Sequence, residues 1–278
     1  MGKTTIIAEV GKNFIITEQD EPIETLLDRA KLLAIKAKEC GASIVKYQTH
    51  VWADESKLRA GSRKEWTLRN ERLTPFNEFW KPLKEYCDEI GIEFLSTGMS
   101  LLAAKKVEPL IQRWKIGSGN LHDLELLEYV ARSDKPIILS SGMTLLKELD
   151  RAVSLIRQFN TNLTILQCTS EYPLKENLTN LNTIKTYKWR YQTDDIGYSD
   201  HTLSLTIPAI AVAMEAKIIE KHITLNKEDW GPDHKMSLNP EEFKEMVQNI
   251  RWVEMIMGSK EKKLTEEELR FRKIFRKV

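Results

Sequence analysis

The chain has 278 residues, of which 41% are hydrophobic and 30% are charged. This much apolar material can build a sizeable core, so the composition excludes a chain that is disordered throughout. Lys and Arg number 42 and Asp and Glu number 41, for a net charge of +1. That balance argues against a protein dedicated to nucleic acid or to an anionic membrane surface. No apolar run approaches the ~18 residues of a membrane span, and no signal-peptide pattern opens the sequence.

The three cysteines, Cys40, Cys87 and Cys168, are widely spaced and form no CxxC pair. This usage is typical of a reducing compartment and excludes a disulfide framework and a zinc ribbon. We therefore expect a cytoplasmic protein. For Cys168, a packed strand thiol is favoured over a thiolate nucleophile.

Short β-branched segments alternate with amphipathic helical segments along the chain. The predicted strands are Thr5–Val10, Ser43–Thr49, Glu93–Thr97, Arg113–Ser118, Pro136–Ser141, Leu163–Thr169, Asp195–Asp200 and Lys217–Thr224. The predicted helices are Glu24–Cys40, Asn77–Ile90, Asp123–Ser133, Thr144–Phe159, Thr179–Tyr187, Ser204–Glu215 and Pro240–Met257. Such alternation predicts parallel strands that are covered on both faces.

Eight β-then-α units predict a single (β/α)8 TIM barrel over residues 1–258, followed by a charged helical tail or linker over 259–278. An open, doubly wound sheet is the alternative. The barrel is favoured because no Gly-rich dinucleotide fingerprint follows the first strand, and Gly117-Ser118-Gly119 does not extend to GxGxxG. The segment between Thr49 and Asn77 is too long for a plain connection. We expect either a lid or a surface insertion with a helical turn there.

Two lysines are placed inside otherwise apolar strands, and a barrel carries its active site at the carboxyl ends of its strands. Lys46 and Lys115, with Ser118, Ser140 and Ser199, would make a rim suited to a phosphate and a carboxylate. The alternative is that each lysine pairs with a core acid such as Glu9 or Glu220, because lysine is rarely buried without a partner.

Two of the five histidines fall at the ends of neighbouring predicted strands, His201 after the seventh and His222 at the eighth. We expect both imidazoles to reach one divalent metal, although a lone strand histidine is more often a satisfied core group. Imidazole and oxygen ligands suit Mn, Fe, Co or Zn. Ser199-Asp200-His201 holds the residue types of a catalytic triad. Alternation along the strand points Asp200 to the opposite face, which excludes a triad.

At these strand ends the chain resembles the sialic acid synthase family, which comprises N-acetylneuraminate synthase and its relatives. The motifs that carry the resemblance extend to about Gly258: Ile7–Gly11, Gly41–Thr49, Phe94–Thr97, Trp114–Gly119, Lys135–Met143, Gln167–Pro173, Ile196–Thr202, Ile219–His222 and Gly231–His234.

The resemblance implies an enzyme that condenses phosphoenolpyruvate with an N-acyl amino sugar such as N-acetylmannosamine, giving a sialic acid or related nonulosonate and phosphate. Phosphoenolpyruvate would be held by Lys46, Thr97, Lys115, Ser118, Ser140 and Ser199. The sugar would face Gln48, Asn120, Tyr172 and Asp233. Lys46, Lys115, Asp233 and Tyr172 would act in catalysis, and His201 and His222 would bind Mn²⁺, with Mg²⁺ or Co²⁺ as alternatives. A homodimer is left open.

Three departures from the family pattern limit this expectation. Phe14, Ile15 and Ile16 follow Asn13 where the family has a His-Asn/Glu-Gly run, and Asn120 stands where an acid often follows Gly119. The sequence given ends after the tail, where the resemblance leads us to expect an antifreeze-like C-terminal domain. Two other functions therefore stay open. One is a non-catalytic barrel that binds phosphorylated ligands. The other is a 3-deoxy-2-keto sugar acid synthase that acts on another aldose, such as an aldose phosphate.

Overall fold

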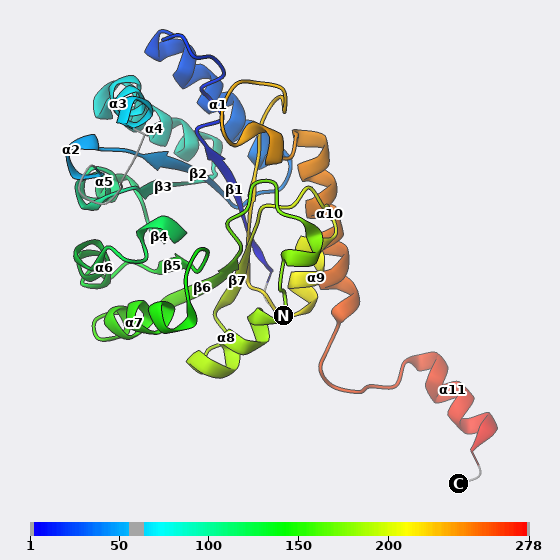
Figure 1. The fold of residues 1–278 in the computed structure, drawn as a ribbon. Helices are drawn as coiled ribbons and strands as arrows, with labels where there is room; N and C mark the ends of the chain where they lie inside the picture. The colour runs from blue at the N-terminus through cyan, green and yellow to red at the C-terminus, as the bar shows by residue number, and fades with distance from the viewer. Residues whose placement is uncertain (1–2, 56–63, 277–278) are drawn as a thin grey trace.

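The computed structural model describes residues 3–55 and 64–276 and contains one eight-stranded sheet (Figure 1). All of its ladders are parallel, and the strand order is β3-β2-β1-β8-β7-β6-β5-β4. β3 also lies against β4, so the sheet closes on itself. The strands are β1 (Thr5–Gly11), β2 (Ile44–Thr49), β3 (Glu93–Gly98), β4 (Trp114–Ile116), β5 (Ile137–Ser140), β6 (Leu163–Cys168), β7 (Ile196–Asp200) and β8 (Ile218–His222). The predicted TIM barrel is confirmed.

Helices follow the strands and surround the barrel (Figure 1). Their bounds are α1 (Ile23–Glu39), α2 (Trp52–Glu55), α3 (Lys64–Leu73), α4 (Lys81–Ile90), α5 (Leu101–Val107), α6 (Leu124–Ala131), α7 (Leu146–Arg157), α8 (Thr183–Tyr191), α9 (Ile207–Ala213), α10 (Pro240–Met257) and α11 (Glu266–Phe275). Within the part of the chain that the structure describes, no helix is both long and apolar enough to cross a membrane.

Local sequence explains where several helices begin and end. Asn239 caps α10: its side chain accepts a hydrogen bond from the backbone of Glu242, whose carboxylate accepts one from the Asn239 backbone. Pro240 occupies the first turn, where a missing N–H costs nothing. Gly91 ends α4 with a φ of 69°, a conformation that glycine adopts without strain.

Some predicted bounds are wrong by a few residues. β4 spans Trp114–Ile116, shorter than predicted, because the chain turns into a short 3₁₀ helix at Ser118. Thr144 does not begin α7, because its hydroxyl donates to the Ser141 carbonyl and the helix starts two residues later. α8 begins at Thr183, four residues after the predicted start.

The long segment after β2 contains α2 and α3, and its residues 56–63 lie outside the described ranges. α3 lies over the loops that follow β1 and β8. The rings of Trp66 and Trp230 are 5.3 Å apart, and the Arg69 guanidinium lies 5.4 Å from the Trp230 ring and pairs with Asp20. The helical insertion thus covers part of one end of the barrel.

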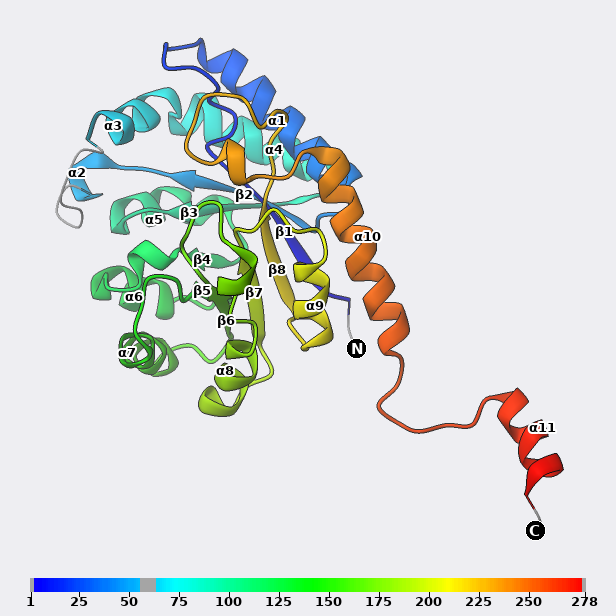
Figure 2. The same cartoon turned by 45° about the vertical axis from the view of Figure 1, so that its right-hand side comes forward.

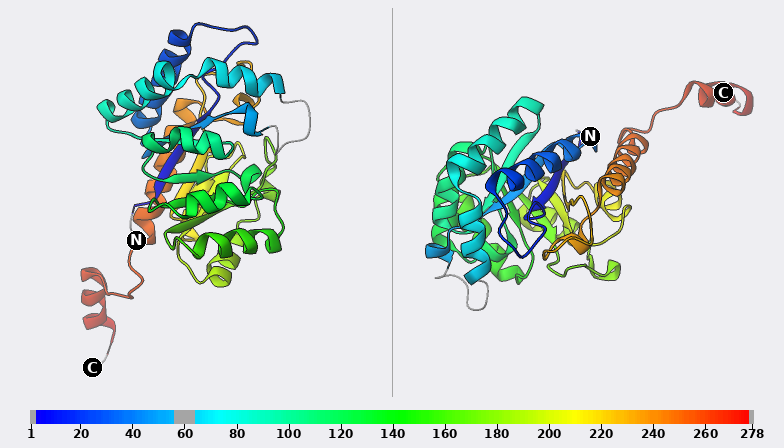
Figure 3. Two further views of the ribbon diagram at one scale, coloured as in Figure 1. Left: turned by 90° about the vertical axis from the view of Figure 1, so that its left-hand side faces the viewer. Right: turned by 90° about the horizontal axis from the view of Figure 1, so that it is seen from above.

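The tail after α10 leaves the barrel and carries α11 on an extended segment (Figures 2 and 3). All three views show α11 standing apart from the other helices. Its side chains are mostly exposed, including Phe271, Ile274 and Phe275.

Candidate active site

Alternation along β7 and β8 sorts their polar residues onto two faces. Ser199 and Glu220 face the barrel interior, where the Ser199 hydroxyl donates to Glu220 Oε1 at 3.1 Å. Asp200 and Lys221 face the surrounding helices and form a fully buried ion pair at 2.5 Å. The sequence expectation that Asp200 points away from Ser199 and His201 is confirmed, so these residues do not form a triad.

The two predicted strand lysines converge inside the barrel on two acids. Lys46 Nζ lies 2.7 Å from Glu9 Oε2 and 3.5 Å from Glu220 Oε2. Lys115 Nζ lies 3.6 Å from Glu220 Oε1 and donates to Ser140 Oγ at 2.7 Å. The pairing alternative therefore holds for both lysines. They still meet at one place, with Thr97 Oγ1 3.5 Å from Lys46 Nζ.

Burial and mutual attraction set the charges in this cluster. Burial by itself lowers the pKa of Lys46, but the Glu220 and Glu9 carboxylates outweigh it and raise that pKa. Burial lowers the pKa of Lys115 against the opposing attraction of Glu220. Burial raises the pKa of Glu9, whereas Lys115 and Lys46 lower the pKa of Glu220 despite its burial. Of the two lysines in this cluster, Lys115 is therefore the one that gains more from an additional anion.

Ser118 lies beside the lysine cluster in a tight cradle around Gly142. The Gly142 N–H donates to Ser118 Oγ at 2.9 Å, and Ser118 donates to Cys168 Sγ at 3.6 Å. A Cβ at position 142 would lie 2.3 Å from Ser170 Oγ and 2.7 Å from Ser118 Oγ. Only glycine fits there. The cradle places two hydroxyls and a thiol next to the predicted phosphoenolpyruvate position.

His201 and His222 lie side by side, with ring centroids 5.6 Å apart. His201 Nδ1 lies 2.8 Å from the Thr169 carbonyl, which fixes a proton on that nitrogen and leaves Nε2 as the acceptor. The buried Nδ1 of His222 has no hydrogen-bond partner within residues 3–55 and 64–276. Burial and the neighbouring His201 hold the pKa of His222 well below its usual range, so its ring is neutral.

The pair of rings fits a divalent cation, because a neutral imidazole with an uncommitted nitrogen, as in His222, is a common metal ligand and the His201 ring lies beside it. Among the described residues, no group of three or more His, Cys, Asp or Glu side chains gathers around one point. The remaining ligands would therefore be oxygens of water or substrate. Burial lowers the pKa of His201, but a hydrogen bond with Cys168 outweighs it and raises that pKa.

The predicted sugar-facing residues occupy two places. Gln48 Nε2 donates to Glu9 Oε1 at 2.9 Å, and a Cβ at Gly11 would lie 3.3 Å from Gln48 Nε2 and 3.2 Å from Asp233 Oδ2. Gln48 and Asp233 are therefore neighbours across Gly11. Tyr172 is half exposed and lies over His201, with ring centroids 4.3 Å apart.

Asn120 is buried at the end of β4 and bonded on one side only. Its Nδ2 donates to the Met99 carbonyl at 2.9 Å, and its Oδ1 has no hydrogen-bond partner in the described part of the chain. Because an amide does not titrate, this position cannot supply the acid that the resemblance leads one to expect.

Sequence reasoning missed Lys12 and named Glu9 and Glu220 only as alternative lysine partners. Lys12 is buried, with 3% of its surface exposed, and its Nζ has no hydrogen-bond partner among the described residues. The one sequence feature that could have indicated Lys12 is its position directly after the first strand, where barrel site residues lie. Nothing in the local pattern indicates that the loop folds inward.

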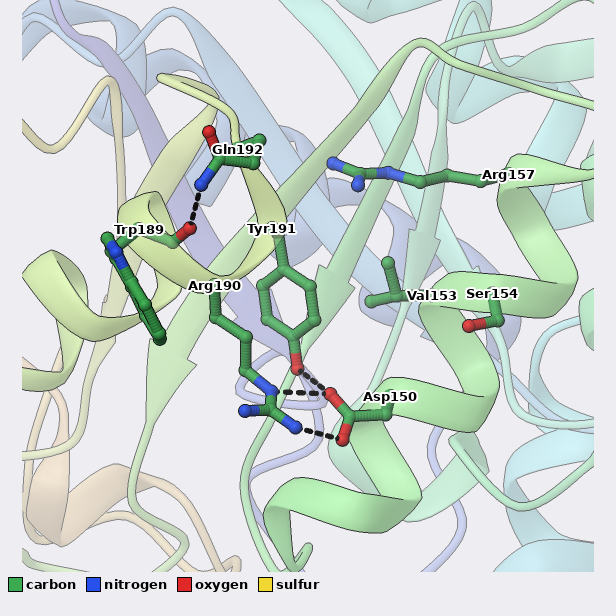
Figure 4. A pocket seen from close by; sticks show the side chains of 8 residues that line it. All are labelled: Asp150, Val153, Ser154, Arg157, Trp189, Arg190, Tyr191 and Gln192. Atoms are coloured by element: carbon green, nitrogen blue, oxygen red, sulfur yellow. Dashed lines mark hydrogen bonds and ion pairs between the residues drawn. The ribbon is translucent and has the colours of Figure 1, made fainter.

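A groove on the outside of the barrel lies between α7 and α8 (Figure 4). Arg190 pairs with Asp150 there at 2.6 Å, and Tyr191 donates to the same carboxylate at 3.1 Å. None of the predicted site residues lines this groove. A second cavity opens at the ends of β5 and β6, where Cys168, Ser170 and Ser141 line it.

Comparison with known proteins shows similarity along most of the chain. A profile of the NeuB family matches residues 33–262. An uncharacterized protein of Methanocaldococcus jannaschii is 40% identical over 91% of this chain and 75% of its own length. The N-acetylneuraminate-9-phosphate synthase of Mus musculus is 35% identical over 93% of this chain and 72% of its own length. A crystal structure of the N-acetylneuraminic acid synthetase of Leptospira borgpetersenii has a TM-score of 0.86 and 29% identity, covering 100% of this chain and 94% of that one.

Proposed function

The chain belongs to the NeuB family, and from this premise we propose that it condenses phosphoenolpyruvate with an N-acyl amino sugar. The products would be a sialic acid or related nonulosonate and inorganic phosphate. The relatives named as synthases of such acids support a sugar acid synthase of this type.

The observation that carries the proposal is the convergence of two buried lysines with hydroxyls inside the barrel. Lys46 and Lys115 contact Glu220 from two sides, and Thr97, Ser140 and Ser199 each contact a member of this group. A trianionic substrate is stabilised by positively charged donors, and hydrogen bonds from a charged donor are stronger than those between neutral groups. Ser118 and the Gly142 cradle supply further donors next to it.

His201 and His222 would hold the divalent cation, which we propose to be Mn²⁺, with Mg²⁺ or Co²⁺ as alternatives. When bound, such a cation polarises an aldehyde oxygen. The neutral state of His222 and its uncommitted Nδ1 support this assignment. Tyr172, whose ring lies tilted beside that of His201, would cover that side of the sugar.

In the proposed reaction, C3 of phosphoenolpyruvate bonds to the aldehyde carbon of the open-chain sugar, and the aldehyde oxygen takes a proton. Water then adds to C2 and releases a proton, and the C–O bond to phosphate breaks. Lys115, with the lowered pKa, and Lys46 would stabilise the charge on the departing phosphate. Asp233, beside Gly11 and Gln48, is the proposed acid or base on the sugar side.

The test is release of phosphate from phosphoenolpyruvate in the presence of N-acetylmannosamine or other N-acyl amino sugars, with Mn²⁺, Mg²⁺ or Co²⁺. We expect release that depends on both sugar and cation and that Lys46→Met and Lys115→Met abolish. Failure of every sugar to give release, together with failure of phosphoenolpyruvate to bind, would overturn the proposal.

A second candidate is a barrel that binds phosphorylated ligands without turnover. The amide of Asn120, in place of an acid, favours it. Phosphoenolpyruvate binding that His201→Ala leaves unchanged, with no phosphate release, would support this candidate over the synthase.

A further inference from the structure

Lys12 differs from the other buried lysines of the described chain in having no partner. Lys46, Lys115 and Lys221 each lie within 4 Å of a carboxylate, whereas Lys12 Nζ contacts no hydrogen-bond acceptor. Burial lowers the pKa of Lys12 to about 7, against the opposing attraction of Glu55 and Glu9. Because a buried ammonium without a partner is costly, this group gains strongly from an anion that binds beside it.

Four charged groups from four elements act on the pKa of Lys12: Glu55 of α2, Glu9 of β1 and Asp233 of the loop after β8 raise it, and Lys106 of α5 lowers it. The carboxylates already hold other groups. Glu9 pairs with Lys46 and accepts a hydrogen bond from Gln48. Glu55 Oε1 lies 2.9 Å from His50 Nδ1 and accepts a hydrogen bond from the Val51 N–H at 3.1 Å. Asp233 also interacts with another group of the chain.

Lys106 adds a second positive charge near Lys12. It is half buried, and burial lowers its pKa more than Glu71 raises it. No ion pair of Lys106 occurs within the described part of the chain, so the loop after β1 and α5 each contribute a lysine without an ion pair, and the two charges repel each other.

The position of Lys12 matches the sugar side of the barrel. It follows Gly11, which separates Gln48 from Asp233. In the circular strand order β1 lies opposite β5, where Ser140 holds Lys115. The two histidines lie on β8 and just after β7, whereas Lys12 faces α2 and α5, which follow β2 and β3. A sugar with its aldehyde near the histidines would extend toward Lys12.

We propose that Lys12, assisted by Lys106, holds an anionic group of the acceptor sugar, a phosphate or a carboxylate at the end away from the aldehyde. The inference rests on the proposed function and names its substrate class: an anionic N-acyl amino sugar is preferred to a neutral one. An anion bound beside Lys12 raises its pKa. Above pH 7 binding therefore takes up a proton, and the affinity for the anionic sugar falls as the pH rises.

The experiment compares kcat/KM for N-acetylmannosamine 6-phosphate, N-acetylmannosaminuronate and N-acetylmannosamine in the wild type, Lys12→Met and Lys106→Met. We expect the wild type to prefer one of the anionic sugars, and which one identifies the anion. A charge-assisted hydrogen bond is worth enough that Lys12→Met lowers kcat/KM for that sugar by about tenfold or more. The value for N-acetylmannosamine stays within about threefold, because the neutral sugar has no such contact. Lys106→Met lowers the value for the anionic sugar by a smaller factor.

The matched control is Lys105→Met, which removes the same charge one residue from Lys106. Lys105 Nζ lies 5.2 Å from the Tyr129 ring, so this variant leaves all three values unchanged. A wild type that prefers the neutral sugar, or an equal loss for neutral and anionic sugars in Lys12→Met, overturns the inference.

Calorimetry of the wild type keeps the inference testable if Lys12→Met does not fold. Titration of the preferred anionic sugar at pH 8, in two buffers of different ionisation enthalpy, counts the protons taken up. Uptake of a proton supports Lys12 as the anion partner, and no uptake overturns it. If phosphoenolpyruvate gives no phosphate with any sugar, the proposed condensation fails, while this binding experiment still decides the role of Lys12.

Discussion

Two buried clusters of lysines and acids lie on opposite faces of the barrel sheet, and they differ in how completely their hydrogen bonds are satisfied. Outside the barrel, Asp200 holds Lys221 at 2.5 Å and accepts from Tyr198, the Thr202 N–H and the Thr202 hydroxyl. Inside, Lys46 lies 2.7 Å from Glu9, but Glu220 lies 3.5 Å and 3.6 Å from its two lysines, and His222 Nδ1 has no partner among the described residues.

This difference separates buried charges that stabilise the fold from buried charges that can bind a ligand. A fully bonded pair leaves no capacity for a substrate, and its loss exposes a buried charge to an apolar environment. A cluster at the carboxyl ends of barrel strands whose polar groups are incompletely bonded can still form hydrogen bonds and ion pairs with a ligand that binds there. Four predictions follow from this contrast.

The largest expected effect is on the outer pair. Lys221→Met leaves the Asp200 carboxylate buried without its cation, so we expect the free energy of unfolding to fall by about 3–5 kcal/mol. Urea denaturation measures it. The double variant Asp200→Leu/Lys221→Met regains part of this loss. A decrease in the free energy of unfolding of less than about 1 kcal/mol in Lys221→Met would contradict a stabilising role for the pair.

The next effect falls on phosphoenolpyruvate. Lys115→Ala removes a charge-assisted contact worth about 1.5–3 kcal/mol, so the affinity for phosphoenolpyruvate falls by about tenfold or more in calorimetry. Glu220 keeps Lys46, so stability changes less than in Lys221→Met. The control is Lys221→Met, measured under conditions in which it is folded. We expect this variant to bind phosphoenolpyruvate with the wild-type affinity. Unchanged affinity in Lys115→Ala contradicts its placement in the site.

His222 provides a further test of this difference, because its buried Nδ1 has no hydrogen-bond partner among the described residues. We expect His222→Gln to lower Mn²⁺ affinity by about tenfold, measured by titration followed with electron paramagnetic resonance. Its melting temperature in the absence of metal stays close to the wild-type value. Equal Mn²⁺ affinity in the variant would remove His222 from the proposed metal site.

The smallest effect is expected for Glu215, a carboxylate near the surface that pairs with Lys188 and Lys260. Hydrogen bonds from Lys188 and Lys260 lower the pKa of Glu215 to about 2. A carboxylate with a lowered pKa contributes stability above its unfolded pKa, and that contribution is lost as the pH falls from about 4.5 toward 2. Since the pair is near the surface, Glu215→Gln costs less than about 1 kcal/mol at pH 7. Thermal unfolding at pH 7 and pH 3 checks this, and a larger cost in acid than at pH 7 would contradict it.

Much of the site followed from the sequence because strands alternate. The period of two placed Lys46 and Lys115 inside otherwise apolar strands and pointed Asp200 away from Ser199, and the contacts agree with both assignments. Helix ends were less predictable. Thr144 has the residue type of a cap but bonds the Ser141 carbonyl, a choice that depends on how the loop folds.

The sequence by itself determined the barrel, the family and the faces of the strands, because these depend on local periodicity and on motifs at strand ends. Only the tertiary structure decided which charges are satisfied. Glu220 reaches two lysines from β2 and β4, and Lys12 is buried among groups from α2, α5 and the loop after β8. Such partners are far apart in the chain, and only closure of the barrel brings them together.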